Sequence, residues 1–212
     1  YLTGYSHTDK ISHNFAISIM KKLNEYCELW KEQTNLGWAV YGTPLESTTS
    51  KFAKSCVRDF GTVDGENVRE YVTNSYHVHV TENINAFDKL AFESEFQELS
   101  TGGAISYVEV PNLTKNLDAV ISVLQFIYEH IMYAELNCKT DYCYKCEFDG
   151  EIKPYRDEEN NPGWKCPQCG NSDTKKLSIV RRTCGYLGSN SSGDIGWNSG
   201  RFAEIADRVL HL

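Results

Sequence analysis

Four cysteines are arranged in two pairs whose spacing suits metal binding. Cys143 and Cys146 form one Cys-x-x-Cys pair, and Cys166 and Cys169 form a second pair after 19 intervening residues. Two tight turns joined by a span of this length place four thiolates at the corners of a tetrahedron, the geometry that Zn²⁺ prefers. Because four thiolates close the coordination shell, we expect a structural zinc site in a zinc-ribbon-like module. Iron can also occupy such a site, and disulfides are the alternative without a metal.

A glycine-punctuated segment follows these cysteines near the end of the chain. It reads Arg181-Arg182-Thr183-Cys184-Gly185-Tyr186-Leu187-Gly188, and the polar residues 189–194 come next. In one interpretation, Gly185 provides a positive φ angle in a tight turn. In the other, Gly185 stores an unpaired electron, because a radical at a glycine Cα is conjugated with the amide on both sides and no Cβ crowds that plane. The polar residues would then give the segment the freedom to reach an activating enzyme.

Composition limits the classes of partner and compartment. The chain has 212 residues, a formal net charge of −8 and eight cysteines. The negative charge argues against direct nucleic-acid binding or an anionic membrane surface, which would need a basic footprint. The sequence has no apolar run of transmembrane length and no secretory signal. Together with the paired cysteine spacing, these features predict a reducing cytoplasm.

Several segments resemble those of one enzyme family, and the resemblance runs over nearly the whole chain. They are Tyr5–Lys10, Tyr41–Glu46, Tyr71–His77, Gly102–Glu109 and Gly200–Ile205, in addition to the four cysteines and the Gly185 segment. The chain resembles the anaerobic (class III) ribonucleoside-triphosphate reductases of the glycyl radical enzyme superfamily. Other members of that superfamily, such as pyruvate formate-lyase, share the glycine loop but lack the four-cysteine module before it. The resemblance therefore favours Gly185 as the radical site.

The resemblance also implies a reaction and its partners. An activase with an iron–sulfur cluster and S-adenosylmethionine would remove hydrogen from Gly185. The radical would pass to a cysteine thiol, and the thiyl radical would take the 3′ hydrogen of a ribonucleoside triphosphate before the 2′-hydroxyl is lost. Formate would be the reductant, and the enzyme would be a homodimer. The protein would orient the reactive atoms and exclude side reactions.

Five further residues are expected near the substrate. By resemblance, Tyr41 and Glu46 line the active site, where Glu46 would handle the proton that leaves with the 2′-hydroxyl or position formate. The alternative for Glu46 is a charge at a helix N-terminus. Asn74 and Ser75 would contact phosphate or ribose, or else serve in a turn. His77 would pack or contact substrate, since no third ligand for a metal is evident.

The cysteine that would form the thiyl radical has no match in this sequence. Cys27 and Cys56 lie in helical patterns and resemble buried small hydrophobes, and Cys184 is expected to point away from its neighbour Gly185. The nucleotide-binding regulatory region is also missing. The chain therefore resembles the C-terminal portion of a reductase and needs the upstream portion of the same enzyme. The alternatives are a zinc-ribbon protein-binding module and another glycyl radical enzyme, such as a lyase or dehydratase.

Hydrophobic periodicity predicts the elements that position these residues. Helices are expected at 9–33, 45–60, 85–99, 117–136 and 201–212, and strands at 36–41, 76–80, 104–110 and 177–180. Alternating helices and strands indicate an α/β fold with parallel strands, but too few to close a barrel. We expect three regions: the C-terminal half of a glycyl-radical-enzyme barrel (1–137), the four-cysteine module (138–176), and the glycyl radical loop with a terminal helix (177–212).

Overall fold

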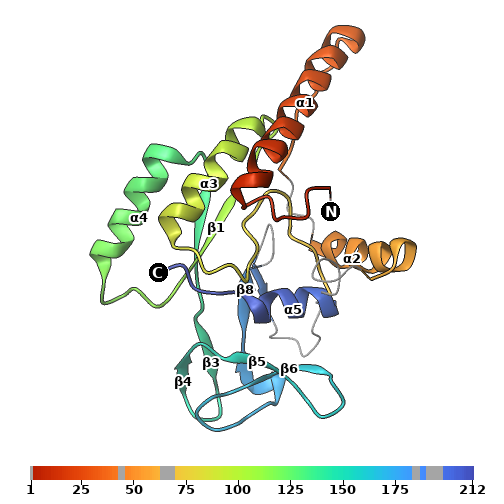
Figure 1. Ribbon diagram of the computed structural model, residues 1–212. Helices are drawn as coiled ribbons and strands as arrows, with labels where there is room; N and C mark the ends of the chain where they lie inside the picture. The colour runs from red at the N-terminus through yellow and green to blue at the C-terminus, as the bar shows by residue number, and fades with distance from the viewer. Residues whose placement is uncertain (1, 43–45, 63–69, 183–186, 190–197) are drawn as a thin grey trace.

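The computed structural model describes residues 2–42, 46–62, 70–182, 187–189 and 198–212. Gly185, Cys184, Thr43, Pro44 and residues 190–194 of the polar stretch lie outside the described residues. The five α-helices of the described part are α1 (Lys10–Thr34), α2 (Glu46–Phe60), α3 (Ala86–Leu99), α4 (Leu117–His130) and α5 (Ser199–Asp207). Figure 1 shows α1 projecting away from the body, with the cysteine-bearing strands in a separate lobe at the opposite end.

Side-chain caps fix where most of these helices begin. Asp9, Asn85, Asn116 and Asn198 each accept a hydrogen bond from a backbone N–H in the first turn of the helix that follows. Such caps satisfy donors that have no partner within the helix. Gly61, just beyond α2, has φ of 76° and donates its N–H to Val57. This left-handed geometry ends the helix where the sequence predicts.

An α/β unit forms the larger part of the body. Strands β1 (Ser106–Val110) and β2 (Ala134–Cys138) are parallel, with Val108 opposite Leu136, and α4 connects them. Side chains of α3, α4 and both strands share one buried apolar cluster that contains Leu90, Val108 and Val123. The predicted α/β arrangement is thus confirmed for one parallel pair within the described residues.

The helix predicted at 117–136 is too long. α4 ends at His130, Ile131 has an extended backbone, and the chain continues into β2. The apolar run that follows the helix pairs with β1 rather than extending the helical turns. Periodicity cannot separate a buried helix from a buried strand when both are apolar.

Two predicted strands are not strands in the structure. Residues 36–41 have no strand assignment, the Val40 carbonyl accepts a single bond from the Gly102 N–H, and Leu36 and Tyr41 are more than half exposed. Residues 76–80 are largely buried yet irregular, because the Val78 N–H donates to the Glu93 carboxylate. Both segments have the composition of a strand, but neither pairs with a neighbouring strand among the described residues.

The cysteine lobe consists of short antiparallel strands. A three-stranded sheet has the order β4 (Phe148–Gly150), β3 (Asp141–Cys143) and β7 (Leu177–Ser178). Two hairpin pairs accompany it: β5 (Lys153–Arg156) with β6 (Pro162–Lys165), and β8 (Val180–Arg182) with β9 (Leu187–Ser189). A 3₁₀ turn, η1, covers Thr174–Lys176. The buried cluster of this lobe includes Phe202 and Ile205 of α5, so the terminal helix packs on the module.

The terminal helix is shorter than the predicted 201–212. α5 ends at Asp207, and the remaining residues run as an extended strap across the α/β unit. Val209 donates its N–H to Val80, and His211 donates to the Glu109 carbonyl while accepting from the Ala86 N–H. These hydrogen bonds outside the helix replace the last helical turn.

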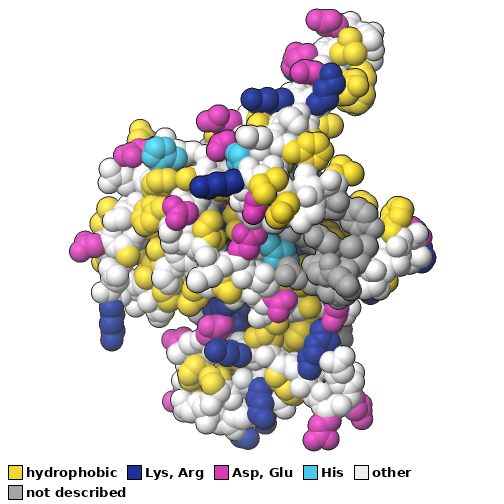
Figure 2. Space-filling model, viewed as in Figure 1, with side chains coloured by type: hydrophobic (Ala, Val, Ile, Leu, Met, Phe, Trp, Pro, Cys, Tyr) yellow, Lys and Arg dark blue, Asp and Glu magenta, His cyan; other side chains and the backbone are white. Residues whose placement is uncertain are grey.

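The projecting helix α1 leaves an apolar stripe uncovered. Phe15, Ile19, Leu23 and Trp30 are each more than 40% exposed, whereas Cys27 is buried. Hydrophobic side chains along this projection are visible in Figure 2. Apolar patches of this kind usually mark a contact surface. No helix among the described residues is long and apolar enough to span a bilayer.

Candidate functional site

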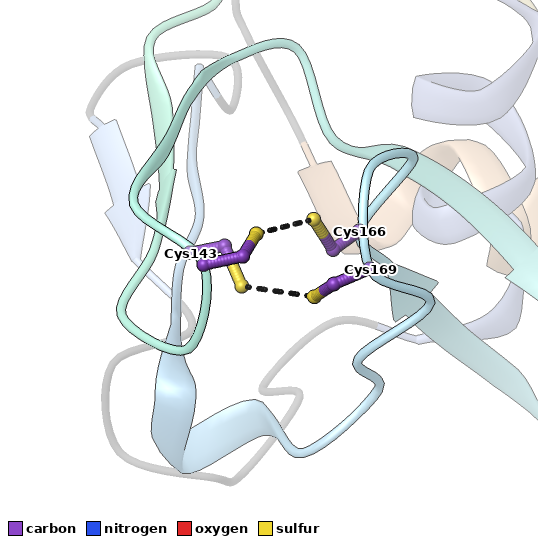
Figure 3. Close-up of side chains that lie close together, drawn as sticks. Cys143, Cys166 and Cys169 are labelled. Carbon is purple, nitrogen blue, oxygen red and sulfur yellow. Dashed lines mark hydrogen bonds between the residues drawn. The ribbon is translucent and has the colours of Figure 1, made fainter.

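The four predicted metal ligands converge on one point. Their sulfur atoms all lie within 4.8 Å of one another. The Cys143 and Cys169 sulfurs are 3.8 Å apart, and those of Cys146 and Cys166 are 3.6 Å apart. A tetrahedron with Zn–S bonds of 2.3 Å has edges of about 3.8 Å. Figure 3 shows the labelled cysteines of the two turns facing one another, so the donor set fits zinc or another tetrahedral thiolate-bound metal.

Both cysteine turns use the same backbone geometry. The Glu147 N–H donates to the Cys143 carbonyl, and the Gly170 N–H donates to the Cys166 carbonyl, at 2.8 and 2.9 Å. Glu147 and Gly170 both have positive φ angles, of 60° and 68°. The two turns therefore have the same form, one with a glycine and the other with a non-glycine residue at the left-handed position.

The electrostatics of the turn favour a thiolate at Cys143. Burial raises the pKa of this thiol, but the backbone N–H groups of Lys145 and Cys146 outweigh that effect, and the pKa falls to about 7. The Asn171 side-chain amide also lies 3.8 Å from the Cys143 sulfur. Donors aimed at sulfur stabilise the charged form that binds a metal.

A buried ion pair connects the cysteine lobe to the strand that precedes Gly185. Asp141, two residues before Cys143, binds both Nη atoms of Arg181 on β8 and accepts the Ile152 N–H. Arg181 also donates to the Ile152 carbonyl at 2.8 Å, and its guanidinium lies 4.9 Å from the centre of the Trp164 ring. Because Asp141 and Arg181 are both almost fully buried, this forked pair fixes β8 to the lobe.

The predicted radical residue lies between two described strands. β8 pairs antiparallel with β9, with Arg181 opposite Gly188 and Arg182 opposite Leu187. Gly185 itself lies outside the described residues. Its radical role therefore stays a prediction, while the strand before it is tied to the cysteine lobe.

The predicted substrate residues are not all brought together. Tyr41 is 57% exposed. Glu46 is the first residue of α2, which matches its alternative role at a helix N-terminus. The Glu46 side chain is not among the parts of the chain that the structure describes. Ser75 is exposed and has φ of 51°, which matches a turn role. Asn74 and His77, by contrast, line the same cavity.

This cavity has a volume of about 70 Å³ and a charged wall. Sequence reasoning missed most of its ionic residues, which are Lys89, Glu109, Arg182, Arg201, Glu204 and Arg208. One signal was available, because Arg201, Glu204 and Arg208 are spaced so that they lie on one side of a helix. The contributions of the strands and of α3 depend on long-range contacts that the sequence does not display.

A buried carboxylate lies beside His77 at the cavity. Glu93 is fully buried and accepts hydrogen bonds from Lys89 and from the Val78 N–H, while its Oε1 lies 3.5 Å from His77 Nδ1. Burial raises the pKa of Glu93, but Lys89 and His77 outweigh it and hold the pKa well below its usual range. His77 thus lies beside an ionised side chain, and no metal-binding group that includes it is found among the described residues.

The known proteins that this chain resembles belong to one family. The family described as anaerobic ribonucleoside-triphosphate reductase matches residues 1–211. Enzymes of that name from Escherichia coli K12 and Haemophilus influenzae are 38% and 36% identical to this chain, over 93% and 100% of its length. The chain covers only 27% and 29% of those two proteins.

Solved structures show the same fold. An anaerobic ribonucleotide reductase covers 95% of this chain with a TM-score of 0.69 and 18% identity, and the chain covers 29% of it. The anaerobic ribonucleotide reductase from Thermotoga maritima with glycerol in the active site covers 86%, with a TM-score of 0.58. Since the family match spans nearly all residues, this chain belongs to the anaerobic ribonucleoside-triphosphate reductase family.

Proposed function

We propose that this chain is the radical-storing portion of an oxygen-sensitive reductase that converts ribonucleoside triphosphates to deoxyribonucleoside triphosphates. Gly185 holds the radical. The observation that carries this proposal is the buried Asp141–Arg181 pair, which fixes the strand before Gly185 to the four-cysteine cluster. Family membership over residues 1–211 disfavours a separate zinc-ribbon binding module and a lyase or dehydratase.

The proposed metal is a structural Zn²⁺ held by Cys143, Cys146, Cys166 and Cys169. When bound, the metal would cross-link the two turns, and its four thiolate ligands would leave no coordination position open for a substrate. The zinc-bound turns would then stabilise α5, whose Phe202 and Ile205 share the apolar core of the cysteines, and Ile179 of that core directly precedes β8.

In the proposed reaction, an activase with S-adenosylmethionine and an iron–sulfur cluster removes one Cα hydrogen from Gly185. The radical passes to a cysteine thiol, and the thiyl radical takes the 3′ hydrogen of the ribose. The proposed reductant is formate, which gives two electrons and becomes carbon dioxide, while the 2′-hydroxyl leaves as water. Tyr41, Glu46, Asn74, Ser75 and His77 are the proposed contacts to the reactants, with Glu46 moving the proton or positioning formate.

The thiyl cysteine and the remaining barrel strands are proposed to come from the upstream portion of the same reductase, within a homodimer. Two observations support a missing portion. The chain spans less than a third of the length of its bacterial relatives, and α1 carries an uncovered apolar stripe. A buried position for that stripe in the complete enzyme would stabilise the assembly.

Electron paramagnetic resonance of the complete enzyme after anaerobic activation tests the radical assignment. We expect a glycyl doublet, and we expect Gly185→Ala to abolish it together with nucleotide reduction. Gly37→Ala is a suitable control, because a Cβ at Gly37 meets no atom within 4 Å. A doublet that survives in the Gly185 variant, or nucleotide reduction without one, would contradict the proposal.

A further inference from the structure

Residues 183–198 contain Gly185 and are called the Gly185 segment from here on. The residues that flank this segment meet in one network of ion pairs. Arg182 is the last described residue before the segment, and α5 begins at Ser199 just after it. We name this network the arginine clamp. Its members are Arg182, Arg201, Arg208, Glu109, Glu135 and Glu204.

The first side of the arginine clamp holds the incoming strand. Arg182 on β8 forms an ion pair with Glu135 on β2, and only about one-twentieth of its surface is exposed. Its guanidinium lies 4.2 Å from the centre of the Tyr107 ring on β1. A partly desolvated cation over an aromatic face adds about 1 to 2 kcal/mol. The backbone therefore enters the Gly185 segment from a residue that contacts both parallel strands.

The second side holds the returning chain to the same place. Arg208 follows α5, and its Nη2 donates to the backbone carbonyl of Arg182 at 3.0 Å. The same side chain binds Glu204 on α5 at 2.9 and 3.1 Å, and its Nη1 lies 3.3 Å from Glu109 on β1. Arg201 adds a 2.7 Å bond to Glu204. One side chain thus joins the residue before the segment to the helix after it.

Buried donors surround two of the acidic members, Glu204 and Glu109. Burial raises the pKa of Glu204, but the charges of Arg208 and Arg201 outweigh that effect and lower it. Both oxygens of Glu109 accept from the Asn137 side-chain amide on β2, at 2.7 and 2.8 Å. Truncating one member would leave buried charges without their partners, which weakens such networks strongly.

We infer that the arginine clamp positions the Gly185 segment for radical transfer, with Arg208 as its central positioning residue. This inference rests on the proposed function. Joining the two ends of a connecting segment reduces the number of conformations that it can adopt. Transfer of a hydrogen atom between carbon and sulfur requires close approach, and a misplacement of about 1 Å can lower a rate by about 100-fold. Arg182 contacts β1 and β2, and Arg208 contacts β1, so both ends of the segment are held against the parallel strands of the α/β unit.

The test is Arg208→Gln in the complete enzyme, activated anaerobically and assayed for spin and for turnover. We expect the glycyl doublet to form, but the kcat per radical to fall by about 10-fold or more, while the KM for the nucleotide stays unchanged. Arg208→Lys retains the charge without the forked geometry, so it should recover part of the loss. Arg58→Gln removes an exposed pair with Asp59 and is the matched control.

Several outcomes separate this inference from the proposed function. If kcat per radical in Arg208→Gln equals that of the unsubstituted enzyme, the arginine clamp has no positioning role. If Arg208→Gln does not fold, Glu109→Gln supplies the same measurement, and an unchanged kcat per radical there overturns the inference. If the unsubstituted enzyme gives no doublet, or Gly185→Ala retains it, the proposed function fails instead.

Discussion

At the scale of single residues, buried ionisable groups carry most of the information. His211 is a clear case, because its Nδ1 accepts the Glu109 N–H at 2.8 Å within the terminal strap. Burial, with the nearby charge of Lys89, lowers the pKa of His211 to about 4, although Glu93 opposes this. The neutral imidazole is therefore part of the folded state, and its protonation must weaken the attachment of the strap.

The folded protein should accordingly lose stability in mild acid. An unfolded histidine has a pKa of about 6.5, so this contribution is complete above that pH and is lost as the pH falls towards 4. After allowance for screening by solvent, the loss is on the order of 2 kcal/mol. Urea unfolding at several pH values should show this decrease in the free energy of unfolding. In His211→Asn, the amide oxygen can also accept the Glu109 N–H, but it does not titrate. The free energy of unfolding should therefore change less with pH over this range, and an equal change in both proteins would refute the assignment.

At the scale of elements, a close approach of two helices depends on one glycine. A Cβ on Gly200 of α5 would lie 2.5 Å from the Glu70 carbonyl oxygen and 2.6 Å from Ser50 Oγ on α2. Gly200→Ala should therefore lower the free energy of unfolding by about 1 to 3 kcal/mol, although alanine is the better helix former. Denaturant midpoints would measure this. Gly37→Ala, in open space, should change the midpoint little, and a neutral Gly200 variant would show that the helices can separate freely.

The elements also show what the sequence can predict. Helical periodicity located α1, α2 and α3 to within a residue or two, because this signal is local. The strand predicted at 36–41 was wrong, since a strand needs a partner that local composition does not reveal. The four cysteines were predicted from spacing alone. The arginine clamp was not, because Glu109, Glu135 and Arg182 are far apart in sequence and meet only through β1, β2 and β8.

At the scale of the whole molecule, the residues that the structure describes form two buried apolar clusters, and different interactions stabilise each. One contains the cysteines together with Trp164, Leu177 and residues of α5, and the other contains α3, α4, β1 and β2. The first is built on short strands and should depend on the proposed metal. The second is a conventional helix-on-strand core. Removing the metal should therefore affect the two parts unequally.

Hydrogen exchange before and after treatment with a zinc chelator should reveal this difference. We expect exchange to increase in β3, β7 and α5, because structural zinc contributes directly to folding and these elements share its core. We expect the same in β8, because Arg181 pairs with Asp141 of β3. Protection in α3, β1 and α4 should stay nearly unchanged. A uniform increase throughout the chain would mean that the clusters form one cooperative unit. An increase limited to the cysteine turns would mean that the Asp141–Arg181 pair holds β8 without help from the metal, and Asp141→Asn with the metal retained should then release β8 alone.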